Sequence, residues 1–178
     1  MTESCKPKRA KFKPLPSYER VRELFHYEPA TGVLTWRIST NNRVKPGDVV
    51  GCPNSNGYWV GHIDGSVYVL HRIIWLWMTG EDPGEREVDH ENTTGADNKW
   101  GNLRLATSSQ NNANWSLSEK NVSGCKGVTW CKQNKKWLAK ITKDRKQEYL
   151  GLFVRVEDAA AAYMTRAREL FGEFARAA

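Results

Sequence analysis

The sequence predicts an α+β protein of two small domains. Two observations come from local pattern: many short β-prone segments are separated by turn residues, and a few longer segments have helical spacing. The third is a polar, unpatterned stretch over 116–123, after which the pattern changes. We therefore expect a basic, disordered tail over 1–14, a first domain over 15–115, a linker over 116–123 and a second domain over 124–176.

The first domain is expected to begin with a helix over 18–25. Its residues Val21, Leu24 and Phe25 fall on one face at helical spacing. The segment 27–32 is expected to be a turn, and the strands that follow are short and bounded by Gly, Asn, Asp and Pro. These strands are expected over 33–37, 58–60 and 67–70.

A second helix is expected over the apolar segment 71–78. Beyond it, two strands at 87–90 and 102–106 flank a polar loop. Ser108 is a candidate cap for a helix over 109–115, because a Ser hydroxyl can accept from the first free backbone amides.

The second domain is expected to hold a three-stranded antiparallel sheet packed on one helix. The strands are predicted over 127–131, 137–142 and 148–153. The helix is predicted over 156–171, with five core-facing residues at helical spacing. These are Val156, Ala160, Tyr163, Ala167 and Leu170.

Positive charge is concentrated at two places in the chain. The net charge is +7, and the sequence pI is about 9.3. Residues 1–14 carry a net +4 and residues 125–150 a net +6, whereas residues 15–124 carry a net −3. This pattern favours a polyanionic partner held by the ends and a metal held by the middle, although charge runs are also common on solvated faces.

Other classes of protein are disfavoured by composition. No stretch approaches the roughly 20 apolar residues that a membrane span needs. The N-terminus lacks the apolar core of a secretory signal, so we expect a cytoplasmic protein. The four cysteines are scattered and are expected to be free thiols.

One carboxylate, one imidazole and two amides lie within a short stretch of the first domain. They are Asp89, His90, Asn102 and Asn111. A carboxylate and an amide oxygen can hold a hard divalent cation, and a neutral imidazole can take a proton from water near pH 7.

This pattern resembles the HNH nuclease family, in the variant whose last His is replaced by Asn. The words that carry the resemblance lie between residues 15 and 115. They are Thr31-Gly32-Val33-Leu34-Thr35-Trp36, Gly57-Tyr58, Leu70-His71-Arg72, Val88-Asp89-His90 and Asn102-Leu103-Arg104.

The resemblance implies a phage-type homing endonuclease with a ββα-metal (His-Me finger) core that hydrolyses DNA phosphodiester bonds. In that reading His90 is the general base, Asn102 holds the loop that aims it, and Asp89 and Asn111 bind one Mg2+ ion, for which Mn2+ can substitute. Asn112 is the alternative ligand if the helix register is shifted. The protein would then work in the cytoplasm of the host cell.

The second domain resembles the DNA-binding domain of plant ethylene-response factors, the Apetala-two type, over 124–176. The resemblance implies a sheet that lies in the major groove of double-stranded DNA. It is carried by Gly127-Val128-Thr129-Trp130, Lys136-Trp137-Leu138-Ala139-Lys140-Ile141, Tyr149-Leu150-Gly151-Leu152-Phe153, Glu157-Asp158-Ala159-Ala160 and Gly172-Glu173-Phe174-Ala175.

The expected DNA contacts are the basic and aromatic residues of this sheet, of which only alternate positions can face DNA. They are Lys126, Trp130, Lys132, Lys140, Thr142 and Arg145. The tryptophans are equally compatible with core positions. Arg155 departs from the family pattern, since relatives often have a capping side chain at this helix start.

Two rival functions stay open from the sequence alone. One is a sequence-specific DNA-binding regulator with an inactive HNH domain. The other is a protein that binds RNA or nucleoprotein through charge. The sequence also leaves open whether the protein is a monomer or a homodimer, and whether it nicks DNA or breaks both strands.

Overall fold

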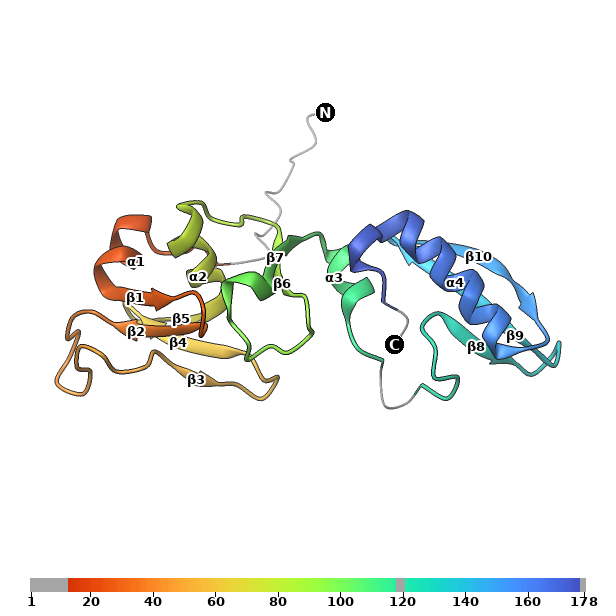
Figure 1. Cartoon of the computed structure of the whole chain (residues 1–178), viewed down its shortest axis with the longest axis horizontal. Coiled ribbons are helices and arrows are strands. Elements are labelled where there is room, and N and C mark those ends of the chain that lie inside the picture. The colour runs from red at the N-terminus through yellow and green to blue at the C-terminus, as the bar shows by residue number, and fades with distance from the viewer. Residues whose placement is uncertain (1–12, 118–120, 177–178) are drawn as a thin grey trace, which may run out of the picture. The chain divides into compact units, whose positions relative to one another are not determined.

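The computed structural model of the chain describes residues 13–117 and 121–176 (Figure 1). It is a mixed α/β structure with several small sheets, and its four α-helices lie within the described residues. The chain divides into two compact units, Met1–Leu105 and Ala106–Ala178. The tail expected over 1–14 lies outside the described residues except for residues 13 and 14, as does part of the linker expected over 116–123.

The N-terminal unit begins with the predicted helix, α1 (Tyr18–Leu24), which is capped by Ser17. The chain then enters β1 (Phe25–Glu28), which pairs antiparallel with β2 (Val33–Trp36). The sequence predicted a turn over 27–32, but the turn is shorter because Tyr27 and Glu28 belong to β1. Tyr27 is 1% exposed, so its burial overrides the turn signal of the residues that follow it.

A second small sheet in the same unit has the strand order β3-β4-β5. Its strands are β3 (Cys52–Pro53), β4 (Trp59–Ile63) and β5 (Ser66–Val69). Helix α2 (Leu70–Thr79) follows β5 directly and ends at Gly80, whose φ of 76° is the left-handed conformation common after a helix. Ile73 and Ile74 of α2 are fully buried, so this helix is the centre of the unit's core.

Arg72 of α2 anchors the loop that leads into the next strand. Its guanidinium is buried and donates to the carbonyls of Arg86 and Gly84 and to Oδ1 of Asp82. These bonds fix the approach of the chain to β6 (Glu87–His90). Strand β6 pairs with β7 (Leu103–Ala106), and the turn η1 (Trp100–Asn102) precedes β7.

The C-terminal unit begins with the last residue of β7 and includes α3 (Ser108–Asn114). The cap of α3 is Thr107 rather than the predicted Ser108. Thr107 Oγ1 accepts from the amide of Gln110, and the Gln110 side chain accepts from the amide of Thr107, which forms a capping box.

A three-stranded antiparallel sheet of order β10-β9-β8 completes this unit with one long helix. The elements are β8 (Val128–Cys131), β9 (Lys136–Lys143), β10 (Lys146–Phe153) and α4 (Val156–Phe171), followed by the turn η2 (Gly172–Phe174). Helix α4 lies along one face of the sheet (Figure 1). Ala139 of β9 and Ala159 of α4 are both fully buried, so small side chains allow the helix and the sheet to approach closely.

Helix α3 is fastened to this unit from two sides. Ser109 Oγ donates to Oδ1 of Asp144 and accepts from the Asp144 amide, and Lys126 Nζ donates to the carbonyl of Ala113. Ala113 itself is buried in the apolar cluster that includes Phe171. The helix that the sequence analysis assigned to the nuclease motif is therefore packed on the sheet and helix of the C-terminal unit.

Within the part of the chain that the structure describes, no helix is long and apolar enough to cross a membrane.

Candidate functional site

The end of β6 carries two buried polar residues in succession. Asp89 and His90 are 5% and 4% exposed. Oδ2 of Asp89 accepts a hydrogen bond from Nε of Arg104 on β7, at 3.0 Å, in an ion pair that is mostly shielded from solvent. The pairing of β6 with β7 therefore places a guanidinium beside the carboxylate that the sequence singled out.

The imidazole of His90 is held by an amide and by two rings. Its Nε2 lies 3.0 Å from Oδ1 of Asn98, which is itself 4% exposed. The rings of His71 and Tyr58 pack against it, with centroids 5.0 and 5.8 Å away. Burial lowers the pKa of His90, although the hydrogen bond to Oδ1 of Asn98 and the charges of Asp89 and Asp97 act in the opposite direction. The imidazole is therefore neutral near pH 7 and has a lone pair to offer.

His71 packs in the same cluster but has different chemistry. Burial, followed by the neighbouring His90 and Arg72, lowers the pKa of His71 to about 3. It is therefore neutral at any physiological pH, which suits packing better than proton transfer. Tyr58 closes the cluster, since its ring contacts both histidines and also lies where a Cβ on Gly95 would stand.

The side chain of Asn102 bonds to the backbone at two places in the loop between β6 and β7. Its Oδ1 accepts from the amide of Asn92 at 3.0 Å, and its Nδ2 donates to the carbonyl of Asp97 at 2.7 Å. A further bond joins Nδ2 of Asn92 to Oδ2 of Asp97. One side chain thus ties both sides of the loop to the start of β7, next to the segment that carries Asn98.

Asn98 was not identified by the sequence reasoning. The loop also contains Asn92, and the sequence does not show which of the two amides the fold brings to His90. Only burial distinguishes them, because Asn98 is buried against His90 whereas Asn92 is exposed. A functional role for this particular amide therefore emerges only from the fold.

Asn111 and Asn112 lie on α3 and so belong to the C-terminal unit. Asn111 is partly buried, and its amide bonds to the carbonyl of Thr107 inside the helix. Asn112 is exposed and lines a cavity in that unit. The N-terminal unit thus brings together Asp89, His90 and Asn102, and α3 carries the fourth residue of the predicted set.

The donors of this set suit a hard cation. No group of three or more His, Cys, Asp or Glu side chains gathers anywhere in residues 13–117 and 121–176 in the manner of a metal centre. A divalent ion would therefore rely on one carboxylate, amide oxygens and water, which is a donor set that Mg2+ accepts and Zn2+ does not favour.

Comparison with known proteins assigns this part of the chain. Residues 68–113 match the family model described as HNH endonuclease, which covers α2, β6, β7 and nearly all of α3. The chain is 34% identical over 106 residues to Protein 3.8 of Escherichia phage T7. That match covers 60% of this chain and 87% of the phage protein. The chain belongs to the HNH endonuclease family. The catalytic histidine of the resemblance, His90, thus lies in a segment whose family is established.

A second relative of this HNH protein comes from a giant virus. The chain is 37% identical over 121 residues to a protein of Acanthamoeba polyphaga mimivirus named Uncharacterized HNH endonuclease L560. The match covers 67% of this chain and 62% of that protein. No solved structure matches the HNH protein described here.

The strand register divides the predicted DNA contacts of the C-terminal unit between the two faces of its sheet. Lys140 pairs with Tyr149, and Thr142 with Gln147, on the face opposite α4. Trp130 pairs with Trp137 on the same face as Val128 and Ala139, which is the face that packs on α4. Trp130 is nevertheless 44% exposed at the end of that face. We call the set Thr129, Leu138, Lys140, Thr142, Gln147, Tyr149 and Leu152 the open face.

The other predicted contacts have distinct surroundings. Lys126 is partly buried and donates to the Ala113 carbonyl. Burial, followed by the charge of Arg176, lowers the pKa of Lys126 to about 8. Lys132 is exposed in the turn after β8. Arg145 lies in the tight turn between β9 and β10 with a φ of 65°.

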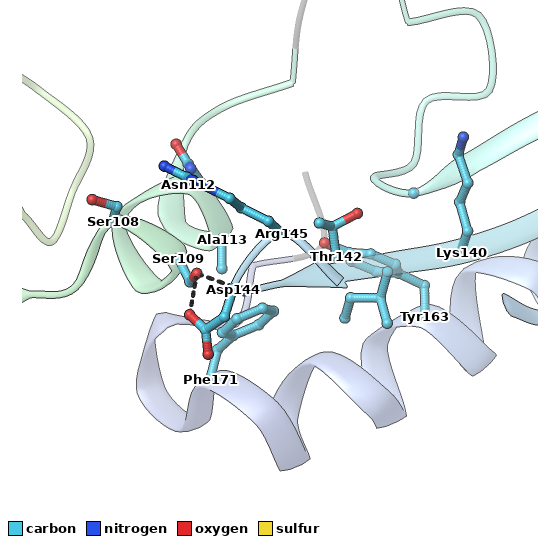
Figure 2. Close-up of a pocket in the computed structure, with 12 residues that line it drawn as sticks. Ser108, Ser109, Asn112, Ala113, Lys140, Thr142, Asp144, Arg145, Tyr163 and Phe171 are labelled. Carbon is cyan, nitrogen blue, oxygen red and sulfur yellow. Dashed lines mark hydrogen bonds between the residues drawn. The ribbon is translucent and has the colours of Figure 1, made fainter. Parts of the chain in front are cut away.

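A cavity of about 690 Å³ lies between α3 and β9 within the C-terminal unit (Figure 2). Lys140, Thr142 and Arg145 line it from the sheet, and Ser108, Ser109 and Asn112 line it from α3. Figure 2 shows the hydrogen bonds between Ser109 and Asp144, both of which line the cavity. Tyr149 was not among the predicted contacts, but its pairing with Lys140 and its 62% exposure place it on the open face.

Proposed function

We propose that the protein is a metal-dependent endonuclease that hydrolyses phosphodiester bonds of DNA. The observation that carries this proposal is the pair at the end of β6, within the segment that matches the HNH family. A buried, neutral imidazole is held at one ring nitrogen and adjoins a buried carboxylate. This combination of a base and a cation ligand is what hydrolysis of a phosphodiester requires.

In the proposed reaction His90 takes a proton from water through its Nδ1. The oxygen of that water bonds to phosphorus, the bond from phosphorus to the 3′ oxygen breaks, and the 3′ oxygen leaves and takes up a proton from solvent. Asp89 and Asn111 are the proposed ligands of one divalent ion, Mg2+ or Mn2+. When bound, that ion supplies positive charge to a phosphate oxygen and to the leaving oxygen.

Arg104 has a defined part in this proposal. Because its Nε holds Oδ2 of Asp89, the carboxylate cannot rotate freely. Asn102 holds the backbone of the loop that faces His90. Both side chains act by orienting their neighbours.

The proposal is tested by cleavage of supercoiled plasmid by the full-length protein with Mg2+ or Mn2+. We expect nicked or linear product that disappears with EDTA and in His90→Ala. His62→Ala is the matched control, because it removes an imidazole that is exposed on β4. Wild-type rates in His90→Ala would refute the assigned base. The ratio of nicked to linear product separates single-strand from double-strand cleavage.

We further propose that the C-terminal unit grips double-stranded DNA through the open face, as an Apetala-two-like domain would. The sheet and helix agree with that fold, and no acidic residue lies among the seven residues of the open face. Lys140 and Arg145 would supply phosphate contacts, and Thr142 and Tyr149 would approach base edges or sugars.

This second proposal is tested by the salt dependence of DNA binding. Replacement of Lys140 by Ala should weaken binding to all sequences and reduce the slope of log K against log salt by about 1. Tyr149→Ala should instead change site preference or affinity with little effect on that slope. Trp130→Ala serves as the comparison, since Trp130 lies on the α4 side of the sheet. Equal losses in all three variants would count against the open face as the DNA surface.

The phage and mimivirus relatives support a viral setting, and we propose a homing-type role in which a phage or prophage encodes the enzyme. One observation favours the alternative of a DNA-binding regulator with an inactive HNH domain: Arg104 already engages the carboxylate of Asp89. Tight, sequence-specific binding without cleavage under any divalent metal would establish that alternative.

A further inference from the structure

The loop amide that contacts His90 determines which ring nitrogen can act. Nε2 of His90 and Oδ1 of Asn98 are 3.0 Å apart, and both residues are 4% exposed. An amide oxygen only accepts hydrogen bonds, so the single proton of the neutral imidazole is placed on Nε2. The lone pair is then on Nδ1.

We propose that Asn98 is a positioning residue that selects the Nε2-protonated tautomer of His90 and fixes the direction of its Nδ1 lone pair. This inference rests on the proposed function, in which His90 takes a proton from water. It assigns a role to a residue outside the four that the HNH motif singled out.

Asn98 is in turn held by a hairpin far away in the sequence. Tyr27 Oη of β1 donates to the Asn98 carbonyl at 2.7 Å. Tyr27 is 1% exposed, and burial raises its pKa to about 12, so the hydroxyl stays protonated and available as a donor. The β1–β2 hairpin therefore fixes the backbone from which the Asn98 side chain reaches His90.

The turn of the same hairpin packs closely against the peptide group between Asn98 and Lys99. Gly32 has a φ of 78°, and a Cβ at this position would collide with the Asn98 carbonyl carbon and the Lys99 nitrogen. The amide of Trp100 donates to the carbonyl of Pro29 at 3.1 Å. The chain after Asn98 is therefore clamped against the hairpin.

The chain before Asn98 is held by the motif itself. Asn102 donates to the carbonyl of Asp97, the residue that precedes Asn98. Asn98 is thus fixed on both sides, by Asn102 through Asp97 and by the hairpin through Tyr27. A side chain whose backbone is restrained in this way can hold an imidazole at one angle, whereas a loop residue without such contacts would let the ring turn.

The test uses full-length protein and two readouts. The first is the tautomer of His90, read from the 15N signals of its ring by NMR at a pH where the ring is neutral, without DNA or metal. The second is kcat and KM for cleavage of a DNA duplex. The variants are Asn98→Leu, which keeps the size but removes the acceptor, and Asn98→Asp, which keeps an oxygen at the same place.

We expect wild type to show the proton on Nε2 and Asn98→Leu to lose that preference. In Asn98→Leu kcat should fall by about 10- to 100-fold, with KM changed by no more than about 2-fold. Asn98→Asp should keep the tautomer and a kcat well above that of Asn98→Leu. Asn56→Leu is the matched control, because it makes the same substitution at an exposed turn residue.

Tyr27→Phe provides a second route if Asn98→Leu does not fold. It removes only the hydroxyl, and we expect a several-fold fall in kcat with a weakened tautomer preference. A proton on Nδ1 in wild type, or an unchanged tautomer and kcat in Asn98→Leu, would overturn the inference. If the tautomer follows the expectation but wild type cleaves nothing with any metal, the role of Asn98 in orienting His90 stands and the nuclease proposal fails.

Discussion

Two adjacent residues, Asp89 and His90, are buried although both can carry charge. The environment treats them differently: Asp89 is compensated by Arg104, whereas His90 is kept neutral by burial and held by an amide. A carboxylate paired with a guanidinium, next to a neutral imidazole, fits the metal-assisted hydrolysis proposed above. The chemistry at this scale depends on the partners of the two side chains as much as on their identity.

We expect Asp89→Ala to remove divalent metal binding at the proposed site. The reason is that the variant lacks the only carboxylate of the proposed ligand set. Isothermal titration with Mg2+ or Mn2+ measures this directly, and Glu91→Ala is a control carboxylate one residue beyond His90. An unaltered affinity in Asp89→Ala would rule out Asp89 as a ligand.

The ion pair between Asp89 and Arg104 should also contribute to stability. Arg104→Leu removes one charge of a shielded pair, so we expect the free energy of unfolding to fall by about 3 kcal/mol. The double variant Asp89→Asn/Arg104→Leu should recover part of that loss, because no charge is then left buried. Urea unfolding of the four proteins in the cycle measures the coupling; additive losses would show that the two side chains do not interact.

His71 should make the protein sensitive to acid. Its pKa is near 6.5 in an unfolded chain and about 3 in the folded protein. Below pH 6.5 the unfolded state therefore binds more protons, and stability falls as the pH drops toward 3, by at most about 1.4 kcal/mol per pH unit. Unfolding at pH 7.5 and pH 5 should show a smaller loss in His71→Gln than in wild type; equal losses would contradict a neutral, buried His71.

At the scale of the elements, the sequence located the helices better than the residues that cap them. The sequence located α4 with its bounds, because alanines and large apolar residues recur at helical spacing, but it assigned the cap of α3 to Ser108 where Thr107 and Gln110 form the box. Several side chains near a helix start can act as caps, and the choice among them depends on backbone angles that sequence does not display.

The start of α4 offers a way to stabilise the protein. Arg155 is the N-cap residue, and its side chain makes no capping hydrogen bond among the described residues. Arg155→Asp should therefore raise the free energy of unfolding by about 1 kcal/mol, since a carboxylate can accept from the first free amides and favours the positive end of the helix. Thermal unfolding measures the gain. Arg155→Ala is the control, because it removes the exposed ion pair with Glu157 without adding a capping side chain. Its free energy of unfolding should differ little from that of wild type.

The candidate site was only partly predictable for a physical reason. Asp89, His90 and Asn102 are close in sequence and keep a spacing that a motif can record. Asn98 and Tyr27 act through contacts that exist only once the β1–β2 hairpin packs on the loop, and Tyr27 is 71 residues away from the carbonyl it binds. The open face likewise could be defined only from the strand register, which places Lys140 and Thr142 on the face opposite to Trp130.

At the scale of the whole molecule, the compact units do not follow the motif boundaries. The HNH match runs to residue 113, but the C-terminal unit begins at Ala106 and contains α3. The sequence predicted the change of domain at 116–123, because that is where apolar periodicity stops. The contacts of Ser109 and Ala113 with the C-terminal unit are made by residues whose local pattern looks like the end of the first domain.

A truncation after residue 115 should therefore do more than remove the unit that we propose binds DNA. We expect α3 to lose its helical structure, because Phe171 and Asp144, which contact Ala113 and Ser109, are gone. Hydrogen exchange of the amides of residues 108–114 would show it, with the amides of α2 as the internal control. Full protection of residues 108–114 in the truncated protein would show that α3 belongs to the N-terminal unit. DNA affinity should fall in the same truncation.

The packing of α3 on the C-terminal unit affects how domains of such proteins can be exchanged by recombination. A crossover that respects the compact units would fall near Leu105 and would transfer α3 together with the open face. Asn111, a proposed metal ligand, would then be transferred with the unit that we propose binds DNA and not with His90. A lineage that exchanged its target specificity in this way would inherit a new target and a new ligand helix in one step, so the two traits would be expected to change together.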